Sequence, residues 1–178
     1  GLISCWGYSA PPLKFAHRGL GEIIIFLNNG LFIMSAMYYA IVGELHKEII
    51  LPSFFLGFLG FAIILMNEIP DYTADKKVQK NNLVVRLGIE AGFTLHRVVT
   101  LLAFSSLLIA IFLKHLPPLC LISCLFPLFL FFKGHYKTPN SQDLQNSATL
   151  TPLCKGAIET KFKSWCLLMA GFIINLYI

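Results

Sequence analysis

The feature that most constrains this sequence is its succession of long apolar runs. Residues 23–42, 49–66, 98–113 and 116–132 are predominantly apolar, and a shorter apolar run covers residues 165–178. About 20 such residues suffice for a helix to cross the hydrocarbon core of a bilayer. Charged residues make up 13% of the chain, whereas about a quarter is usual in soluble proteins. The sequence therefore predicts an all-α, polytopic bundle of about five transmembrane helices.

Composition also narrows the possible partners. A net charge of +5 would be compatible with nucleic-acid binding, but the basic residues lie between the apolar runs, where they orient helices in a membrane. We expect a lipid bilayer as partner and no nucleic acid. The five cysteines are odd in number and form no CxxC pair. Neither a disulfide framework nor a zinc site is therefore indicated.

The densest cluster of ionisable groups is the stretch NEIPDYTADKKVQKNNLVVRLG, residues 67–88. In it, Asn67, Asp71 and Asp75 recur at every fourth position, which on a helix would place their side chains on one face. Such oxygen ligands suit Mg²⁺, which binds proteins through one or two carboxylates plus the phosphates of a substrate. We predict Asp71 and Asp75 as metal ligands and Asn67 as an auxiliary ligand. A solvated loop is the alternative for a DxxxD spacing on its own.

Basic residues follow the two aspartates. Lys76, Lys80 and Arg86 are predicted to bind or attract the oxygens of a diphosphate, Arg86 as a rigid fork and the lysines as mobile point charges. Lys77 would point roughly 200° away from Asp75 on a helix of 3.6 residues per turn. We expect a smaller role for it. The stretch thus has the composition of half of a metal and diphosphate site.

The whole pattern closely resembles the second aspartate-rich motif of the UbiA-type intramembrane aromatic prenyltransferases. The match covers the NxxxDxxxD spacing, the Lys-rich turn and the ending LVVRLG, with departures at Pro70 and at residues 79–82. The VVRLG ending is most similar to the branch that prenylates 1,4-dihydroxy-2-naphthoate for menaquinone synthesis. Further upstream, YSAPPLK and RGLGE resemble a connection that borders the active site of this family. That resemblance implies substrate-binding roles for Tyr8, Lys14 and Arg18.

The resemblance implies an enzyme that transfers a polyprenyl group from a polyprenyl diphosphate to an aromatic acceptor, with Mg²⁺ as cofactor. Asp71 and Asp75 would be its catalytic residues, through the metal ion. The implied acceptor is 1,4-dihydroxy-2-naphthoate, and 4-hydroxybenzoate or a chlorophyllide-type ring is the alternative. A transport or scaffold protein without catalysis is the alternative of another class. The ionisable residues lie at the ends of the apolar runs rather than at their midpoints, which disfavours transport.

The family fold has nine helices and two aspartate-rich motifs. Residues 1–178 would form a single membrane domain that corresponds to the last five of these helices. The three Asp residues of the chain, Asp71, Asp75 and Asp143, include no second motif, which we expect upstream. We therefore predict a C-terminal fragment that is inactive alone.

The positive charges predict an orientation. With five spans, one side of the membrane receives 12 of the 14 Lys and Arg residues and the other side receives Lys47 and Lys114. Short cytoplasmic loops carry the excess of positive charge. The aspartate-rich loop is therefore predicted to face the cytoplasm from the cell membrane. The larger set consists of Lys14, Arg18, Lys76, Lys77, Lys80, Arg86, Arg97, Lys133, Lys137, Lys155, Lys161 and Lys163.

Overall fold

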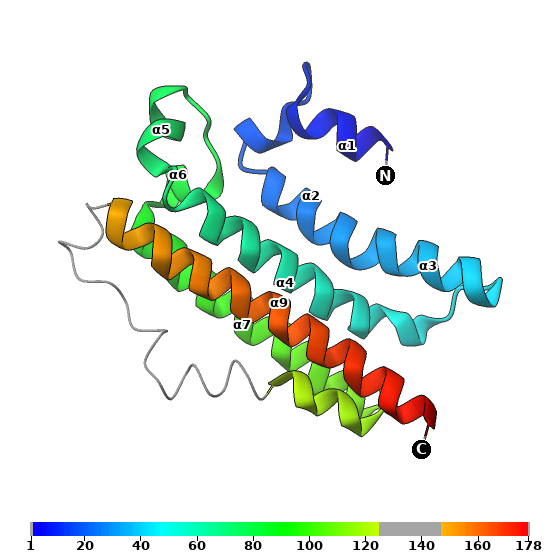
Figure 1. Ribbon diagram of the computed structural model, residues 1–178. Coiled ribbons are helices and arrows are strands. Elements are labelled where there is room, and N and C mark those ends of the chain that lie inside the picture. The colour runs from blue at the N-terminus through cyan, green and yellow to red at the C-terminus, as the bar shows by residue number, and fades with distance from the viewer. Residues whose placement is uncertain (1, 125–146, 178) are drawn as a thin grey trace.

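The structure is a computed structural model that describes residues 2–124 and 147–177. In these two ranges every regular element is a helix (Figure 1). Three helical stretches are long and apolar enough to cross a membrane: Gly21–Val42, Lys47–Glu68 and Ile89–Phe112. They correspond to the first three expected spans. The prediction of an all-α membrane bundle is therefore confirmed.

The first spanning stretch is not a uniform α-helix. A short helix α1 (Leu2–Ser9) and a single 3-10 turn η1 (Phe15–His17) precede it. The stretch itself begins as α2 (Gly21–Leu27), widens into the π-helical turn η2 (Asn28–Phe32) and continues as α3 (Ile33–Val42). A π-helical turn inserts extra backbone into a helix. It changes the direction of the side chains halfway along the span.

That turn crosses the next span at very short range. An added Cβ atom at Gly30 would lie 2.5 Å from the backbone oxygen of Ser53, and one at Gly60 would lie 2.6 Å from Nδ2 of Asn29. A side chain at position 30 would force the two backbones apart, and one at position 60 would displace the Asn29 side chain. Small residues let helix backbones approach closely in membranes, where packing drives association. The glycines therefore fix how the first span crosses the second.

The second and third spans form the main core. The turn η3 (Lys47–Ile49) leads into α4 (Ile50–Glu68), which packs against α7 (Ile89–Phe112). Helix α7 begins at Ile89 rather than at residue 98, so the predicted span continues outward into the polar stretch. The buried cluster between these helices and their neighbours comprises Phe55, Leu59, Ala103, Leu107, Ala110, Leu116, Cys120 and Leu168.

The fourth expected span, residues 116–132, is described only in its first part. Residues Pro118–Cys124 form the 3-10 helix η4. The remainder of that run, together with Lys133, Lys137 and Asp143, lies outside the described residues.

The C-terminal region differs from the sequence-based prediction. The polar composition of residues 133–163 predicts a loop with one short amphipathic piece before a short last span, whereas α9 is one helix of 31 residues, Ser147–Tyr177. It includes Pro152 and does not reach the apolarity of the three spanning stretches. The expected last span is the C-terminal half of this helix. The prediction of a loop is therefore wrong from Ser147 onward.

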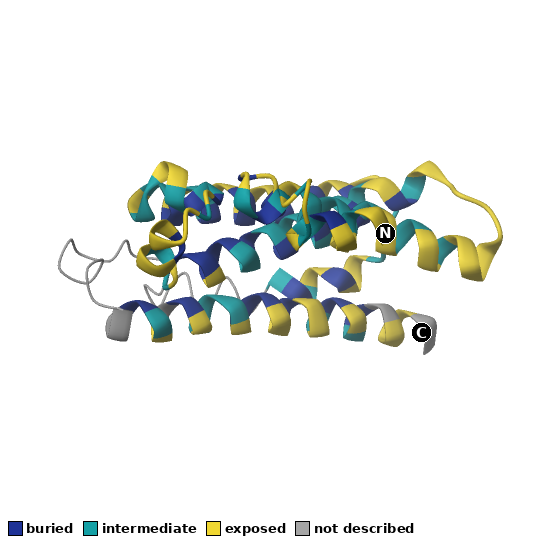
Figure 2. Cartoon of the chain, turned by 90° about the horizontal axis from the view of Figure 1, so that it is seen from above, coloured by how far each residue is buried: buried dark blue, intermediate teal, exposed yellow. Residues whose placement is uncertain are grey.

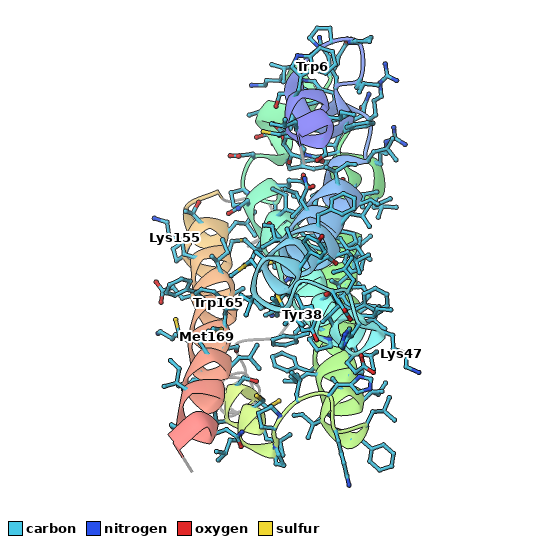
Figure 3. The ribbon with its side chains drawn as sticks, turned by 90° about the vertical axis from the view of Figure 1, so that its right-hand side faces the viewer. Trp6, Tyr38, Lys47, Lys155, Trp165 and Met169 are labelled. Atoms are coloured by element: carbon cyan, nitrogen blue, oxygen red, sulfur yellow. The ribbon has the colours of Figure 1, made fainter. Side chains whose placement is uncertain are left out.

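Two hydroxyl residues are accommodated inside this helix. Thr160 and Ser164 are buried, and each donates a hydrogen bond to a backbone oxygen one turn earlier, at 2.7 Å and 2.9 Å. Each hydroxyl group therefore has a hydrogen-bond partner inside the helix although it is shielded from water. They extend a buried stripe that faces the other helices (Figure 2). Lys155, Trp165 and Met169 point away from the bundle on the opposite side (Figure 3).

A second hydrophobic cluster lies directly beneath the polar stretch of residues 67–88. It joins the end of α4, the start of α7, the start of α9 and two residues of the polar stretch itself, Ile69 and Val84, which are both fully buried. These two residues tie the polar stretch to the bundle. The members of the cluster are Leu65, Met66, Ile69, Val84, Phe93, Leu150 and Cys154.

Candidate functional site

The polar stretch between α4 and α7 folds into two short helices. Helix α4 ends at Glu68, and a turn through Pro70 leads to α5 (Tyr72–Lys77) and then α6 (Leu83–Leu87). Proline lacks the N–H that a continuing helix would need. Gly88, with φ of 90°, separates α6 from α7. We call residues 67–88 the aspartate loop.

The three predicted oxygen ligands therefore do not share one continuous helix. Asn67 lies in the last turn of α4, Asp71 stands just before α5, and Asp75 lies within α5. A helical hydrogen bond from the Asp75 N–H to the Asp71 oxygen, at 2.8 Å, still keeps the two aspartates one turn apart. The three ligands were expected on one face of one helix. The structure instead has Asp71 and Asp75 one helical turn apart, with Asn67 on the other side of the turn that separates α4 from α5.

The Asp75 carboxylate is held from two sides. Lys80 Nζ forms a salt bridge to its Oδ2 at 2.9 Å, and Asn82 Nδ2 donates a hydrogen bond to the same oxygen at 2.8 Å. Asp75 is buried although it is charged. Buried charges require partners of this kind. Both contacts engage Oδ2, and the carboxylate has further acceptor sites with which it would hold a metal ion.

Asp71 and Asn67 are exposed. Within residues 2–124 and 147–177 no group of three or more His, Cys, Asp or Glu side chains could hold a metal ion. Mg²⁺, however, commonly binds through one or two carboxylates and completes its coordination with water and substrate phosphates. The carboxylates of Asp71 and Asp75 fit that mode. The residues present suit a metal ion that arrives together with a diphosphate rather than a permanent metal cage.

The three predicted cations lie on the same loop in different environments. Lys80 is paired with Asp75, as described above. The Lys76 ammonium lies 5.7 Å from the centre of the Tyr72 ring and is exposed to solvent. Arg86 is exposed too, and its Nε donates to the Asn81 backbone oxygen at 3.0 Å. The two exposed cations are accessible to an incoming anion.

The predicted residues of the first connection lie beside this loop only in part. Lys14 and Arg18 are exposed, and Arg18 donates to the backbone oxygen of Pro12 at 2.8 Å. The connection reaches the aspartate loop at Gly19, where an added Cβ atom would lie 3.0 Å from Nε of Arg86. The structure thus brings the RGLGE segment against Arg86 without a described contact between Arg18 and the aspartates.

Two buried acids lie beneath the site and were missed from the sequence. Glu22 is fully buried at the start of α2, and Glu68 is 6% exposed at the end of α4. Tyr8 lies near both: burial raises the pKa of its hydroxyl, and the charges of Glu68 and Glu22 raise it further. The available signal was an acidic residue directly adjoining an apolar run. Such a position is usually solvated, so neither acid is singled out by the sequence alone.

These observations define a class of protein first. It is an integral membrane protein whose helices carry a polar loop, rich in carboxylates and cations, at one end of the bundle (Figure 1). Residues 1–174 match the UbiA prenyltransferase family, and the chain belongs to that family. No solved structure matches it significantly.

Two characterised relatives match part of the chain. One is the 2-carboxy-1,4-naphthoquinone phytyltransferase of Synechocystis sp., which is 28% identical over 85 residues. The other is the 1,4-dihydroxy-2-naphthoate octaprenyltransferase of Escherichia coli, which is 30% identical over 87 residues. The matched segments cover 48% and 49% of this chain, and 28% of the length of each relative.

Proposed function

We propose that this chain is part of an aromatic prenyltransferase that transfers a polyprenyl group from a polyprenyl diphosphate to 1,4-dihydroxy-2-naphthoate. The observation that carries the proposal is the match of residues 1–174 to the UbiA prenyltransferase family. The choice of acceptor is supported by the names of the two relatives, both of which refer to naphthalene-derived rings. The product would belong to menaquinone biosynthesis.

In this proposal the aspartate loop binds the diphosphate end of the donor. Asp71 and Asp75 hold Mg²⁺, with Asn67 as auxiliary ligand. When bound, Mg²⁺ would supply charge stabilisation to the departing diphosphate. The contacts of Asp75 support this role, because Lys80 and Asn82 fix its carboxylate through a single oxygen. An immobile carboxylate is a better metal ligand than one that must be ordered on binding.

The cations of the loop have a complementary role. Lys76 and Arg86 are exposed on the loop that carries the aspartates, so they attract and orient the diphosphate oxygens. The Lys80 ammonium lies 2.9 Å from Asp75, which is proposed to hold the metal ion. Its flexible four-carbon side chain would let it contact the diphosphate bound to that ion. Tyr8, Lys14 and Arg18 border the site from the first connection. Together these groups stabilise the charge that develops as the allylic C–O bond breaks.

The acceptor reacts at carbon. Its electron-rich ring forms a bond to the allylic carbon of the donor while the diphosphate leaves, and the ring carboxylate is lost in the 1,4-dihydroxy-2-naphthoate reaction. The protein's contribution to this step is to hold the two reactants in contact and to exclude water.

The proposal includes an orientation, with the aspartate loop on the cytoplasmic side of the cell membrane. The distribution of charge supports it. Lys76 and Lys80 lie on the loop, at the end of the bundle opposite the turns that carry Lys47 and Lys114 (Figure 1). A cysteine introduced at Lys77 should react with a membrane-impermeant thiol reagent only from the cytoplasmic side. Labelling from outside would overturn the orientation.

The activity is tested in membranes that contain the whole enzyme of which this chain is part. Polyprenyl diphosphate, 1,4-dihydroxy-2-naphthoate and Mg²⁺ should give prenylated naphthoquinol product, and EDTA should abolish the product. Parallel assays with 4-hydroxybenzoate measure acceptor choice. Product from 4-hydroxybenzoate alone would reject the assigned acceptor, and equal turnover with EDTA would reject the metal.

A further inference from the structure

Glu22 occupies an unusual position for an acid. It is the second residue of α2 and is fully buried. Its Oε1 atom accepts a hydrogen bond of 2.7 Å from the backbone N–H of Leu83, a residue 61 positions away in the sequence. A buried carboxylate is retained at a cost unless its contacts offset the lost hydration. Its contact with the aspartate loop is therefore the first place to look for its role.

Leu83 is the first residue of α6, and the first N–H groups of a helix have no partner inside the helix. Two side chains supply the missing acceptors here. Asn82 Oδ1 accepts from the Val85 N–H at 2.8 Å, and Glu22 accepts from the Leu83 N–H. One acceptor is local and the other comes from a different part of the chain. Glu22 therefore sets where α6 begins in space.

Further contacts connect the same two segments, residues 17–22 and residues 81–86. We call this contact between the two segments the joint. The Asn81 N–H donates to the His17 oxygen at 3.3 Å. Gly19, with φ of 66°, packs so closely against the loop that an added Cβ atom would lie 3.2 Å from the Asn81 oxygen. Residues 17–22 thus pack along residues 81–86. Glu22 provides the contact between these segments in which a side chain accepts from a backbone N–H, that of Leu83.

The joint is connected to the proposed metal ligand Asp75 through Asn82. Asn82 stands next to Leu83 in the chain, and its Nδ2 atom donates to Oδ2 of Asp75 at 2.8 Å. Moving Leu83 would move Asn82, and with it the contact that orients the Asp75 carboxylate. Glu22 makes no described contact with Asp75 itself.

We propose that Glu22 is a positioning residue for the metal and diphosphate site, which acts by accepting the Leu83 N–H and thereby fixing Asn82 and Asp75. This inference rests on the proposed function of the aspartate loop. What matters at position 22 is a hydrogen-bond acceptor of the right length. Its negative charge is not required for this role.

The first test compares Glu22→Gln with Glu22→Leu in the whole enzyme. Glutamine keeps an amide oxygen at the same reach, whereas leucine keeps the volume without an acceptor. Glu22→Gln should retain activity within about threefold, since it preserves the hydrogen bond. Glu22→Leu should need at least tenfold more Mg²⁺ for half-maximal rate and lose less activity at saturating Mg²⁺. Equal losses in both variants would show that the charge is required and would overturn the proposal.

Leu83→Pro removes the same hydrogen bond from the donor side. Proline is tolerated at the first position of a helix, and Asn82 already has extended backbone angles, with ψ of 174°, that suit a residue before proline. Leu83→Ala is the matched control, because it shortens the same side chain and keeps the N–H. Leu83→Pro should reproduce the Mg²⁺ effect of Glu22→Leu, and the double variant should be no worse than either. Additive losses would overturn the proposal.

Hydrogen exchange supplies a readout that does not depend on catalysis. Amides of residues 81–87 should exchange at least tenfold faster in Glu22→Leu and Leu83→Pro than in the parent, Glu22→Gln and Leu83→Ala. If the exchange rates of these amides are unchanged in Glu22→Leu, Glu22 does not fix the start of α6, and the positioning role is rejected even if the enzyme is a prenyltransferase. The expected exchange pattern alongside full turnover of Asp75→Asn would reject the proposed function and leave the joint intact. If Glu22→Leu does not fold, Leu83→Pro and its control decide the matter.

Discussion

The two ends of the bundle are built differently. At the aspartate loop, the buried side chains of Asp75 and Asn82 are hydrogen-bonded to each other, and the buried Glu22 of α2 accepts from the backbone N–H of Leu83 at the start of α6. At the opposite end, residues 43–46 between α3 and η3 are exposed. The side-chain contacts described there are an exposed pair, His46 with Glu44 at 3.5 Å, and the His46 ring with the Tyr38 ring, whose centres lie 5.8 Å apart.

The difference shows where rigidity is required. An exposed ion pair contributes little to stability, commonly about 0–1 kcal/mol. Buried polar groups are favourable only when each has a partner, so a network of them specifies one geometry. The opposite end needs only to reverse the chain. The aspartate loop holds carboxylates in defined positions, which is what the proposed diphosphate site requires.

The largest expected effect comes from the aspartates. Asp71→Asn or Asp75→Asn should lower prenyl transfer by at least about a hundredfold, because each removes charge from a metal site that supplies several kcal/mol. Glu44→Gln, at the opposite end of the bundle, should leave the rate unchanged. The measurement is product formation at saturating Mg²⁺ with equal amounts of folded protein. Near-normal turnover of both asparagine variants would remove the functional contrast between the two ends.

Asn82→Ala should have the next largest effect. It deletes the cap of α6, typically worth about 1 kcal/mol, and a hydrogen bond to a charged group, worth roughly 1.5–3 kcal/mol. We expect about a tenfold higher Mg²⁺ requirement and a lower unfolding temperature. Asn81→Ala is the matched control, since the contacts described for Asn81 are made by its backbone. Similar losses in the two variants would contradict the assignment of Asn82.

A smaller effect is expected from the helix crossing, away from both ends. Gly30→Ala places a methyl group 2.5 Å from the Ser53 oxygen, and overpacking of this kind typically costs about 1–3 kcal/mol. Gly156→Ala in α9 meets nothing within 4 Å and is the control. Thermal unfolding in detergent should separate the two variants. Equal stability would show that the close crossing is absent in the membrane.

The smallest effect is expected at Lys77. It is exposed on α5, one residue beyond Lys76. Lys77→Ala should change the rate by less than about twofold, as is usual for exposed positions away from a site. Lys80→Ala should lower it more, because it also removes the ion pair with Asp75. A larger loss of rate in Lys77→Ala than in Lys80→Ala would indicate that the diphosphate binds at the other face of α5.

The sequence predicted the spans that are apolar throughout and failed where polar residues are buried. Residues 23–42 and 49–66 correspond closely to the first two spanning stretches, because hydropathy alone defines them. A polar side chain such as Asn28, inside the first stretch, is expected either to bond to another helix or to line a cavity, and it accepts from the Ser4 hydroxyl of α1 at 2.8 Å. Helix α9 was missed in its first half, since the polar composition there favours a loop; Thr160, for example, is accommodated by its bond to the Gly156 backbone oxygen.

For the site, the sequence predicted local spacing but not distant contacts. The pair Asp71 and Asp75 is one helical turn apart as expected. The role of Pro70 as a helix breaker follows from its chemistry, and it explains why Asn67 lies across a turn. The contact of Glu22 with Leu83 joins residues 61 positions apart. No local pattern encodes such a pairing, because it depends on how α2 and α6 meet in the bundle.

The hydrogen bonds of the aspartate loop have an entropic consequence. Fixing the backbone of one residue in a single conformation costs roughly 1–2 kcal/mol of entropy. Contacts to Asp75, Leu83 and Asn81 order this segment as part of folding. In the proposed function, an arriving diphosphate would therefore not have to order the chain around itself. Its binding free energy would remain available to align the allylic carbon with the acceptor ring.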